Sequence, residues 1–222
     1  RGARIKDAGK STVVVEGVER LTSAEYTVMP DRIVATTYLS AAAITGGRVL
    51  LSSVHPNDME SVLPVFEQAG CDLKVYGESI LLSRRGGLQP VKSLRTMPYP
   101  GFPTDAQAPI MAMLSLAEGT SIFIENIFEN RYRHVDELIR MGASIRVSGR
   151  VAVVTGVERL HSAPVRCTDL RGGAALCVAA LAAEGETRVS QICHIDRGYE
   201  DLARDLRALG ADAVRVEETE NG

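Results

Sequence analysis

The chain has 222 residues, of which 45% are hydrophobic and 24% charged, with a net charge of −3 and a pI of about 5.9. These values are typical of a globular protein of one or two domains that buries a large core without disulfide or metal staples. The sequence has no basic tract, no signal peptide and no apolar run of the roughly 18 residues that span a membrane. We therefore expect no nucleic-acid partner, no membrane span and a cytoplasmic location.

The four cysteines are too scattered to indicate a metal site or a disulfide framework. None of them forms a Cys-x-x-Cys pair, the spacing that zinc sites and redox motifs require. The positions are Cys71, Cys167, Cys177 and Cys193. We expect neither a bound metal nor a cofactor.

The first residues read as the end of a structural repeat. Residues 1–6 have the Gly-Ala-strand pattern that ends later units, and a second strand is predicted at residues 12–16. The string Gly-Val-Glu-Arg-Leu follows at residues 17–21 and recurs at residues 156–160. Recurrence at such a long period is typical of a stacked or pseudo-symmetric architecture.

Three similar units follow. Each opens with an aspartate before an apolar helix and reaches a second, amphipathic helix that ends at a glycine before a strand. The aspartate and glycine pairs are Asp31 and Gly70, Asp105 and Gly142, and Asp169 and Gly210. The first helices, predicted at residues 33–44, 106–117 and 173–183, are apolar on nearly every side, so we expect them to be buried. Each aspartate can cap its helix by accepting free backbone N–H groups.

Strands complete each unit. A β-rich run follows each first helix, at residues 48–53, 121–125 and 187–192, and paired strands follow Gly70 and Gly142. Each unit therefore reads β-α-β-α-β-β, and the chain is α/β. After Gly210 only one strand is predicted, at residues 214–217. We infer that one strand is missing, because a lone edge leaves backbone groups unpaired, and that chain preceding residue 1 supplies it.

Helix starts with arginines nearby favour an anionic ligand. Free N–H groups and the helix dipole attract negative charge, and guanidinium groups bind carboxylate or phosphate in a bidentate way. Four arginines lie at or near helix starts: Arg32, Arg131, Arg171 and Arg197. Matching parts of similar units should share one surface, which would suit a phosphorylated or carboxylated ligand. The alternative, that these are surface or ion-paired arginines, stays open.

Asp105 differs from the other two aspartates because no arginine stands beside it in the sequence. A carboxylate without an adjacent cation is freer to take a proton, which suits a general base. The alternative is a plain helix cap. The Pro-rich loop at residues 99–103 leads into Asp105 and can aim its carboxylate or serve only as a connector. His134 and His194 are candidates for acid–base groups or for structural hydrogen bonds.

Five motifs in this order resemble the enolpyruvyl transferase family, and within it the UDP-N-acetylglucosamine enolpyruvyl transferases. They stand at residues 30–33, 102–105, 128–131, 169–171 and 194–200. The resemblance covers the whole chain and about the C-terminal half of the family's sequence. It implies two lobes, each an inside-out α/β barrel of three β-α-β-α-β-β units. Residues 1–29 would then be a remnant of the other lobe plus the hinge, and residues 30–222 the C-terminal lobe, with units at about 31–97, 98–160 and 161–222.

The resemblance also implies a reaction. In it, the enolpyruvyl group of phosphoenolpyruvate moves to the 3′-hydroxyl of UDP-N-acetylglucosamine and phosphate leaves, the first committed step of peptidoglycan synthesis. Asp105 matches the residue that binds the sugar hydroxyl and takes its proton, and Arg171 and Arg197 match residues that bind phosphoenolpyruvate. Ile127 and Arg131 match the nucleotide-sugar site. Further candidates on these motifs are Arg32, Asp169 and Phe128.

The resemblance places the family's general acid in the half of the protein that is absent here, so that half is an expected partner and this chain alone is predicted to have no turnover. A second interpretation is the related shikimate-pathway synthase, which shares the fold and phosphoenolpyruvate. A third is a non-catalytic paralogue. The retention of Asp105, Arg171 and Arg197 together argues against the third interpretation.

Overall fold

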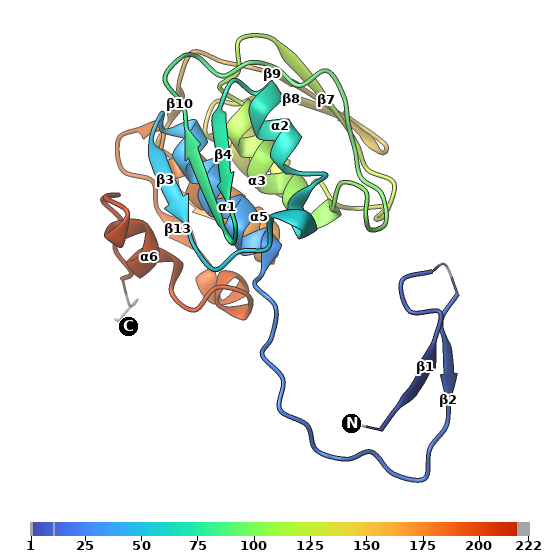
Figure 1. Cartoon of the computed structure of the whole chain (residues 1–222). Coiled ribbons are helices and arrows are strands. Elements are labelled where there is room, and N and C mark those ends of the chain that lie inside the picture. Colours follow the sequence, from blue (N-terminus) through green and yellow to red (C-terminus); the bar gives the residue numbers. More distant parts are fainter. Residues whose placement is uncertain (1, 11, 217–222) are drawn as a thin grey trace, which may run out of the picture.

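Three helices without a polar face lie at the centre of the molecule, and the strands lie outside them (Figure 1). The computed structural model describes residues 2–10 and 12–216. The three helices are α1 (Arg32–Ile44), α3 (Thr104–Leu114) and α5 (Leu170–Ala180), and each contacts the other two. Their buried surfaces are rich in alanine, as the sequence predicts for a helix that packs on every side.

The three helices begin close to the predicted positions but two of them end earlier. The predicted last turns of α3 and α5 are not helical. At the end of α3, the carbonyl of Ser115 accepts from Val157 N (2.8 Å), and Glu118 N donates to the carbonyl of Leu88 (2.7 Å). Beyond Leu114, short turns and hydrogen bonds to other segments therefore replace the regular helical pattern.

An antiparallel sheet and a mixed sheet cover the first two units, and their strands match the predicted ones closely. The first sheet has the order β3-β5-β4, from β3 (Arg48–Leu51), β4 (Asp72–Tyr76) and β5 (Ser79–Ser83). The second has the order β6-β7-β9-β8, from β6 (Leu94–Arg95), β7 (Thr120–Ile124), β8 (Ser144–Ser148) and β9 (Val151–Thr155). Strand β6 runs parallel to β7, so the middle unit shows the full predicted order β-α-β-α-β-β and confirms the α/β class.

The third unit has only short strands. Two parallel ladders join β10 (Leu160–His161) to β12 (Ala183–Glu184) and β11 (Val165–Arg166) to β13 (Val189–Ser190). The strand predicted at residues 187–192 stops because Gln191 has a positive φ of 57° and the 3-10 helix η2 (Ile192–Arg197) follows.

The second helices are short and pack through one apolar face. They are α2 (Leu63–Gln68), α4 (Val135–Arg140) and α6 (Leu202–Ala208), and the 3-10 helix η1 (Pro56–Met59) precedes α2. In α6, Leu202 and Leu206 are buried, whereas Leu209 just beyond its end is exposed. Within the part of the chain that the structure describes, no helix combines the length and the apolar character needed to cross a membrane.

The two ends of the chain contribute little to the core. A hairpin of β1 (Arg4–Lys6) and β2 (Val14–Glu16) lies apart from the rest and is joined to α1 by an extended segment (Figure 1). The strand predicted at residues 214–217 is wrong for residues 214–216, which are exposed and irregular; residue 217 lies outside the described residues. A strand needs a neighbouring strand, and none of the described segments pairs with this one.

Gly156, in the recurring Gly-Val-Glu-Arg-Leu string, lies against the end of α3, where a side chain should lower the stability of the fold. A Cβ at this position would overlap the backbone carbonyl of Ala117, which other hydrogen bonds hold in place. Gly156→Ala should therefore lower the free energy of unfolding by about 3 kcal/mol, the upper end of the usual cost of overpacking. Gly86→Ala is the matched control, because its Cβ would meet open space. Equal urea midpoints for the two variants would contradict this packing.

Candidate active site

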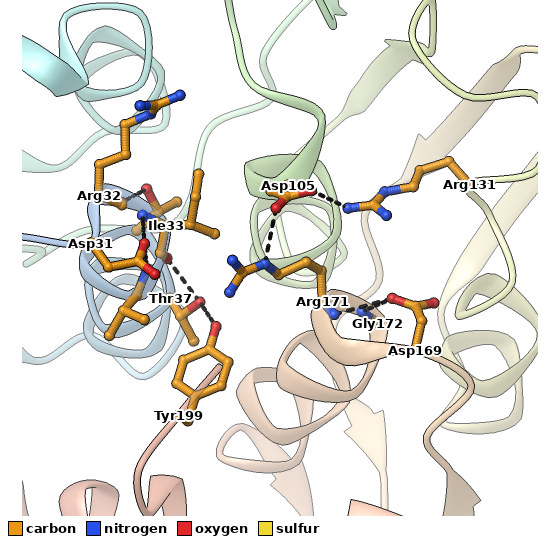
Figure 2. Close-up of polar contacts among 12 residues, drawn as sticks. Asp31, Arg32, Ile33, Thr37, Asp105, Arg131, Asp169, Arg171, Gly172 and Tyr199 are labelled. Atoms are coloured by element: carbon orange, nitrogen blue, oxygen red, sulfur yellow. Dashed lines mark hydrogen bonds and ion pairs between the residues drawn. The ribbon is translucent and has the colours of Figure 1, made fainter. Parts of the chain in front are cut away.

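The starts of α1, α3 and α5 lie side by side, and charged residues gather there (Figure 2). Asp31 caps α1 by accepting from Ile33 N (2.7 Å) and Val34 N (3.1 Å). Asp169 caps α5 in the same way, from Arg171 N (3.1 Å) and Gly172 N (2.8 Å). Both predicted caps are confirmed.

Asp105 is not a cap, and the expectation that it has no cation beside it is wrong. The cap position of α3 is Pro103, and Asp105 lies in the first helical turn. Its carboxylate accepts from Arg131 Nη2 (2.6 Å) and from Arg171 Nε (3.2 Å). The two arginines are distant in sequence, which is why the sequence around Asp105 gave no sign of them. Charge-assisted hydrogen bonds of this kind are among the strongest in proteins.

Arg171 reaches from the start of α5 to the start of α3 and has donor capacity to spare. Its side chain is 11% exposed, and its guanidinium lies 5.9 Å from the centre of the Tyr199 ring. The Tyr199 hydroxyl lies 2.6 Å from Thr37 Oγ1 on α1, and burial raises the pKa of Tyr199, so the phenol is neutral. Arg171 Nη1 is buried and bonds to none of the described residues. A buried unpaired N–H is unfavourable, so this atom is ready to donate to an anionic ligand.

A cavity of about 340 Å³ opens beside Asp105. Its lining includes Arg32, Ile33, Tyr99, Asp105, Ile127 and Phe128. The Arg32 guanidinium lies 5.3 Å from the centre of the Tyr99 ring, and the Arg131 guanidinium lies 5.3 Å from that of Phe128. Cations over aromatic faces are stabilised electrostatically, so these pairs hold both arginines at the cavity.

A second cavity, of about 480 Å³, lies on the outer face of the first sheet, against Leu50 and Tyr76. It is larger but lies on the sheet rather than at the helix starts, and it includes no pair of opposite charges. The chemistry therefore points to the cavity beside Asp105. Among the described residues, no group of three His, Cys, Asp or Glu side chains could hold a metal ion.

Most predicted site residues come together, but Arg197 does not join them. Asp105, Arg131 and Arg171 form one cluster; Arg32, Ile127 and Phe128 line the cavity next to it. Arg197 ends η2 and is exposed, and none of the hydrogen bonds or ion pairs of residues 2–10 and 12–216 connects it to Asp105. Its role stays a prediction.

Sequence reasoning missed Glu125, a buried carboxylate that accepts four hydrogen bonds from segments around the cavity. The only local signal is a charged residue directly after the apolar strand β7. Such a residue is more often a solvated strand end, so the position did not stand out.

His134 is a neutral core residue and not an acid–base group. It is 1% exposed, and burial lowers its pKa to about 4, with the nearby Arg131 acting in the same direction and Asp169 opposing it. Neither ring nitrogen makes a well-aligned hydrogen bond with the described residues, and the contact of the ring with the backbone of Arg131 raises its pKa only slightly. The structural hydrogen bond of His134 stays a prediction.

Acid should destabilise the fold through His134. Its folded pKa is lowered, so the unfolded chain takes up a proton below about pH 6.5 while the folded chain stays neutral there. The stability that depends on the neutral ring is complete above pH 6.5 and is lost as the pH falls towards 4. His134→Leu should therefore gain about 2 kcal/mol over the wild type between pH 8 and pH 4.5 in urea unfolding. A constant difference between the two proteins at both pH values would contradict a buried neutral ring.

With the site described, comparison with known proteins identifies the family. The family model for EPSP synthase (3-phosphoshikimate 1-carboxyvinyltransferase) matches residues 1–206. The chain belongs to this family. The resemblance predicted from the five motifs is therefore confirmed.

Curated members of this family share about half of their aligned residues with the chain. The UDP-N-acetylglucosamine 1-carboxyvinyltransferase of Xylella fastidiosa (strain M23) is 50% identical over 97% of the chain, and that of Zymomonas mobilis is 53% identical over 97%. The chain covers 51% and 50% of these two proteins, so it spans about half the length of the curated relatives that it matches.

Solved structures of the family confirm the fold. The enolpyruvyl transferase NikO from Streptomyces tendae superposes with a TM-score of 0.83 at 29% identity, over 95% of this chain and 51% of that one. EPSP synthase from Acinetobacter baumannii gives a TM-score of 0.67 at 22% identity, over 87% and 45% respectively, and supports the fold alone. The predicted enolpyruvyl transferase-like α/β architecture is thus correct.

Proposed function

We propose that this chain is part of an enzyme that transfers the enolpyruvyl group of phosphoenolpyruvate to the 3′-hydroxyl of UDP-N-acetylglucosamine and releases phosphate. The observation that carries the proposal is the cluster of Asp105, Arg131 and Arg171 at the adjoining starts of α3 and α5. Relatives about 50% identical are named for this reaction. The reaction would take place in the cytoplasm and would be the first committed step of peptidoglycan synthesis. It would serve cell-wall formation, cell shape and cell division.

The cluster supplies both chemical needs of the reaction. An alcohol must lose a proton as its oxygen attacks the C2 atom of phosphoenolpyruvate, and Asp105 is the carboxylate in reach of the cavity that can accept it. The phosphate and carboxylate of phosphoenolpyruvate need cations, and Arg171 has a buried N–H group without a partner among the described residues. In the addition, C3 of phosphoenolpyruvate would take a proton from the general acid that the resemblance assigns to the other half of the protein. The tetrahedral ketal would then lose phosphate and a C3 proton to give the enolpyruvyl ether.

The ion pairs of Asp105 suggest how binding prepares the base. Both carboxylate oxygens of Asp105 accept from arginine N–H groups. An anion that binds Arg171 would compete with Asp105 for the guanidinium, so one carboxylate oxygen would become available to the sugar hydroxyl. Phosphoenolpyruvate binding would then increase the ability of Asp105 to act as a base.

The rest of the site is proposed to come from the other half of the protein. The resemblance assigns the general acid to that half, and the chain spans only about half of its relatives. We assign residues 30–222 to one lobe, and residues 1–29, with the β1–β2 hairpin and the extended segment, to a remnant of the other lobe plus the hinge. The exposed Arg197 would meet phosphoenolpyruvate when the two lobes close.

The shikimate-pathway alternative is less well supported. The family model carries the name of that enzyme, but the solved EPSP synthase is only 22% identical, which speaks for the fold and not for the substrate. Relatives about 50% identical carry the other name. Titration of the full-length gene product with UDP-N-acetylglucosamine and with shikimate 3-phosphate separates the two; preferential binding of shikimate 3-phosphate would reject the proposed acceptor.

Loss of the Asp105 carboxylate should abolish most of the turnover. In the full-length gene product, Asp105→Asn should lower kcat by about 10²–10⁴, the usual contribution of a positioned general base. Phosphate release with both substrates is the measurement. Asp72→Asn, an exposed carboxylate on β4, is the matched control and should keep the wild-type rate. Unchanged turnover in Asp105→Asn would remove this residue from the mechanism, and phosphate release by the 222-residue chain alone would show that the other half is not needed.

A further inference from the structure

Glu125 is a buried carboxylate that no ion pair of the described residues neutralises. It is 1% exposed and directly follows β7. Its Oε1 atom accepts from Thr96 Oγ1 (2.8 Å), Ile127 N (2.8 Å) and Phe128 N (3.1 Å), and its Oε2 atom accepts from Thr104 Oγ1 (3.0 Å). A buried charge is tolerated only when such donors replace water, so these four hydrogen bonds are what keep the carboxylate inside.

The four donors belong to three segments that are separated along the sequence. Thr96 follows β6, Thr104 is the first residue of α3, and Ile127 and Phe128 form a wall of the cavity. Thr96 strengthens the junction, since its Oγ1 also accepts from Asn126 N (2.8 Å). Through its single side chain, Glu125 therefore joins the end of β6, the start of α3 and the cavity wall.

The bond to Thr104 bears directly on Asp105. No side chain caps α3, so the bond of the Thr104 hydroxyl to Glu125 is a second side-chain attachment of this helix start, in addition to the ion pairs of Asp105. Asp105 is the next residue, and its carboxylate must meet two arginines and a ligand. Small displacements of a reacting group are costly in rate, so an attachment at this point controls the chemistry.

We infer that Glu125 is a positioning residue, which sets both the Asp105 carboxylate and the Ile127–Phe128 wall through its four hydrogen bonds. The inference about turnover rests on the proposed function. The inference about geometry does not, because the backbone N–H groups of Ile127 and Phe128 report on it without any substrate.

The first experiment compares Glu125→Ala with Ser121→Ala in the full-length gene product. Ser121 lies on β7, the strand that Glu125 follows, is equally buried and accepts one hydrogen bond, from Val91 N (3.0 Å), near the other end of that strand. In Glu125→Ala, amide hydrogen exchange at Ile127 and Phe128 should rise about tenfold more than at neighbouring β7 amides, because the acceptor is gone. In Ser121→Ala these two amides should exchange as in the wild type.

Kinetics should separate positioning from general destabilisation. Glu125→Ala should lower kcat about 50-fold and raise KM for UDP-N-acetylglucosamine about tenfold, with KM for phosphoenolpyruvate within twofold. Glu125→Gln keeps an acceptor oxygen for Ile127 and Phe128, and its amide can donate to Thr104, so it should restore both constants to within about fivefold of the wild type. Ser121→Ala should lose stability but keep its kinetic constants.

Thr104→Val tests the attachment of Asp105 by itself. It removes one hydroxyl at nearly constant shape, so kcat should fall about tenfold while both KM values and the exchange of Ile127 and Phe128 stay unchanged. This variant also decides the matter if Glu125→Ala does not fold. Wild-type kinetics in Thr104→Val, or kinetic constants of Glu125→Ala that match those of Ser121→Ala, would overturn the positioning role. A wild-type protein without turnover would instead reject the proposed function and leave the exchange test to decide on Glu125.

Discussion

The fold depends on the close packing of three helices that have no polar face. Such helices must lie inside, so the sheets cover them from outside, and the segments around them pack closely enough to exclude larger side chains at some positions. At Gly173 on α5, for example, a Cβ would lie 2.8 Å from Cys167 Sγ and 2.9 Å from Ile195 Cγ1. The helices pack with their starts at one end. The packing alone therefore gathers the free N–H groups of the first turns, and the residues that precede the helices, at that end.

A series of contacts between polar side chains crosses this end of the molecule and connects all three units. Thr37 on α1 meets Tyr199, whose ring lies against Arg171; Arg171 binds Asp105 on α3, and Asp105 binds Arg131 (Figure 2). Each member is held by a neighbour from a different part of the chain. The carboxylate is therefore placed by the packing of the helices and not by its own loop, and Glu125 accepts a hydrogen bond from Thr104, the residue before Asp105.

Local sequence patterns correctly predicted the helix caps and hairpins, because these depend mainly on neighbouring residues. Asp31 and Asp169 stand before apolar helices and do cap them, and the hairpins after Gly70 and Gly142 form as their alternation indicates. The pairing of Asp105 with Arg131 and Arg171 was beyond such reasoning, because it arises only when separate units pack together. The prediction for residues 214–216 was wrong for a related reason: strand propensity without a neighbouring strand gives no strand. Glu125 escaped notice since a charged residue after a strand normally faces water.

The most direct test of this arrangement is a double-mutant cycle between Asp105 and Arg171, measured by urea unfolding of the 222-residue chain with Asp105→Ala, Arg171→Ala and the double variant. Contacting residues in one charge-assisted network couple, so the interaction free energy should be at least about 1 kcal/mol. Additive effects, with a coupling below about 0.3 kcal/mol, would contradict the claim that the helix starts bring these two side chains together.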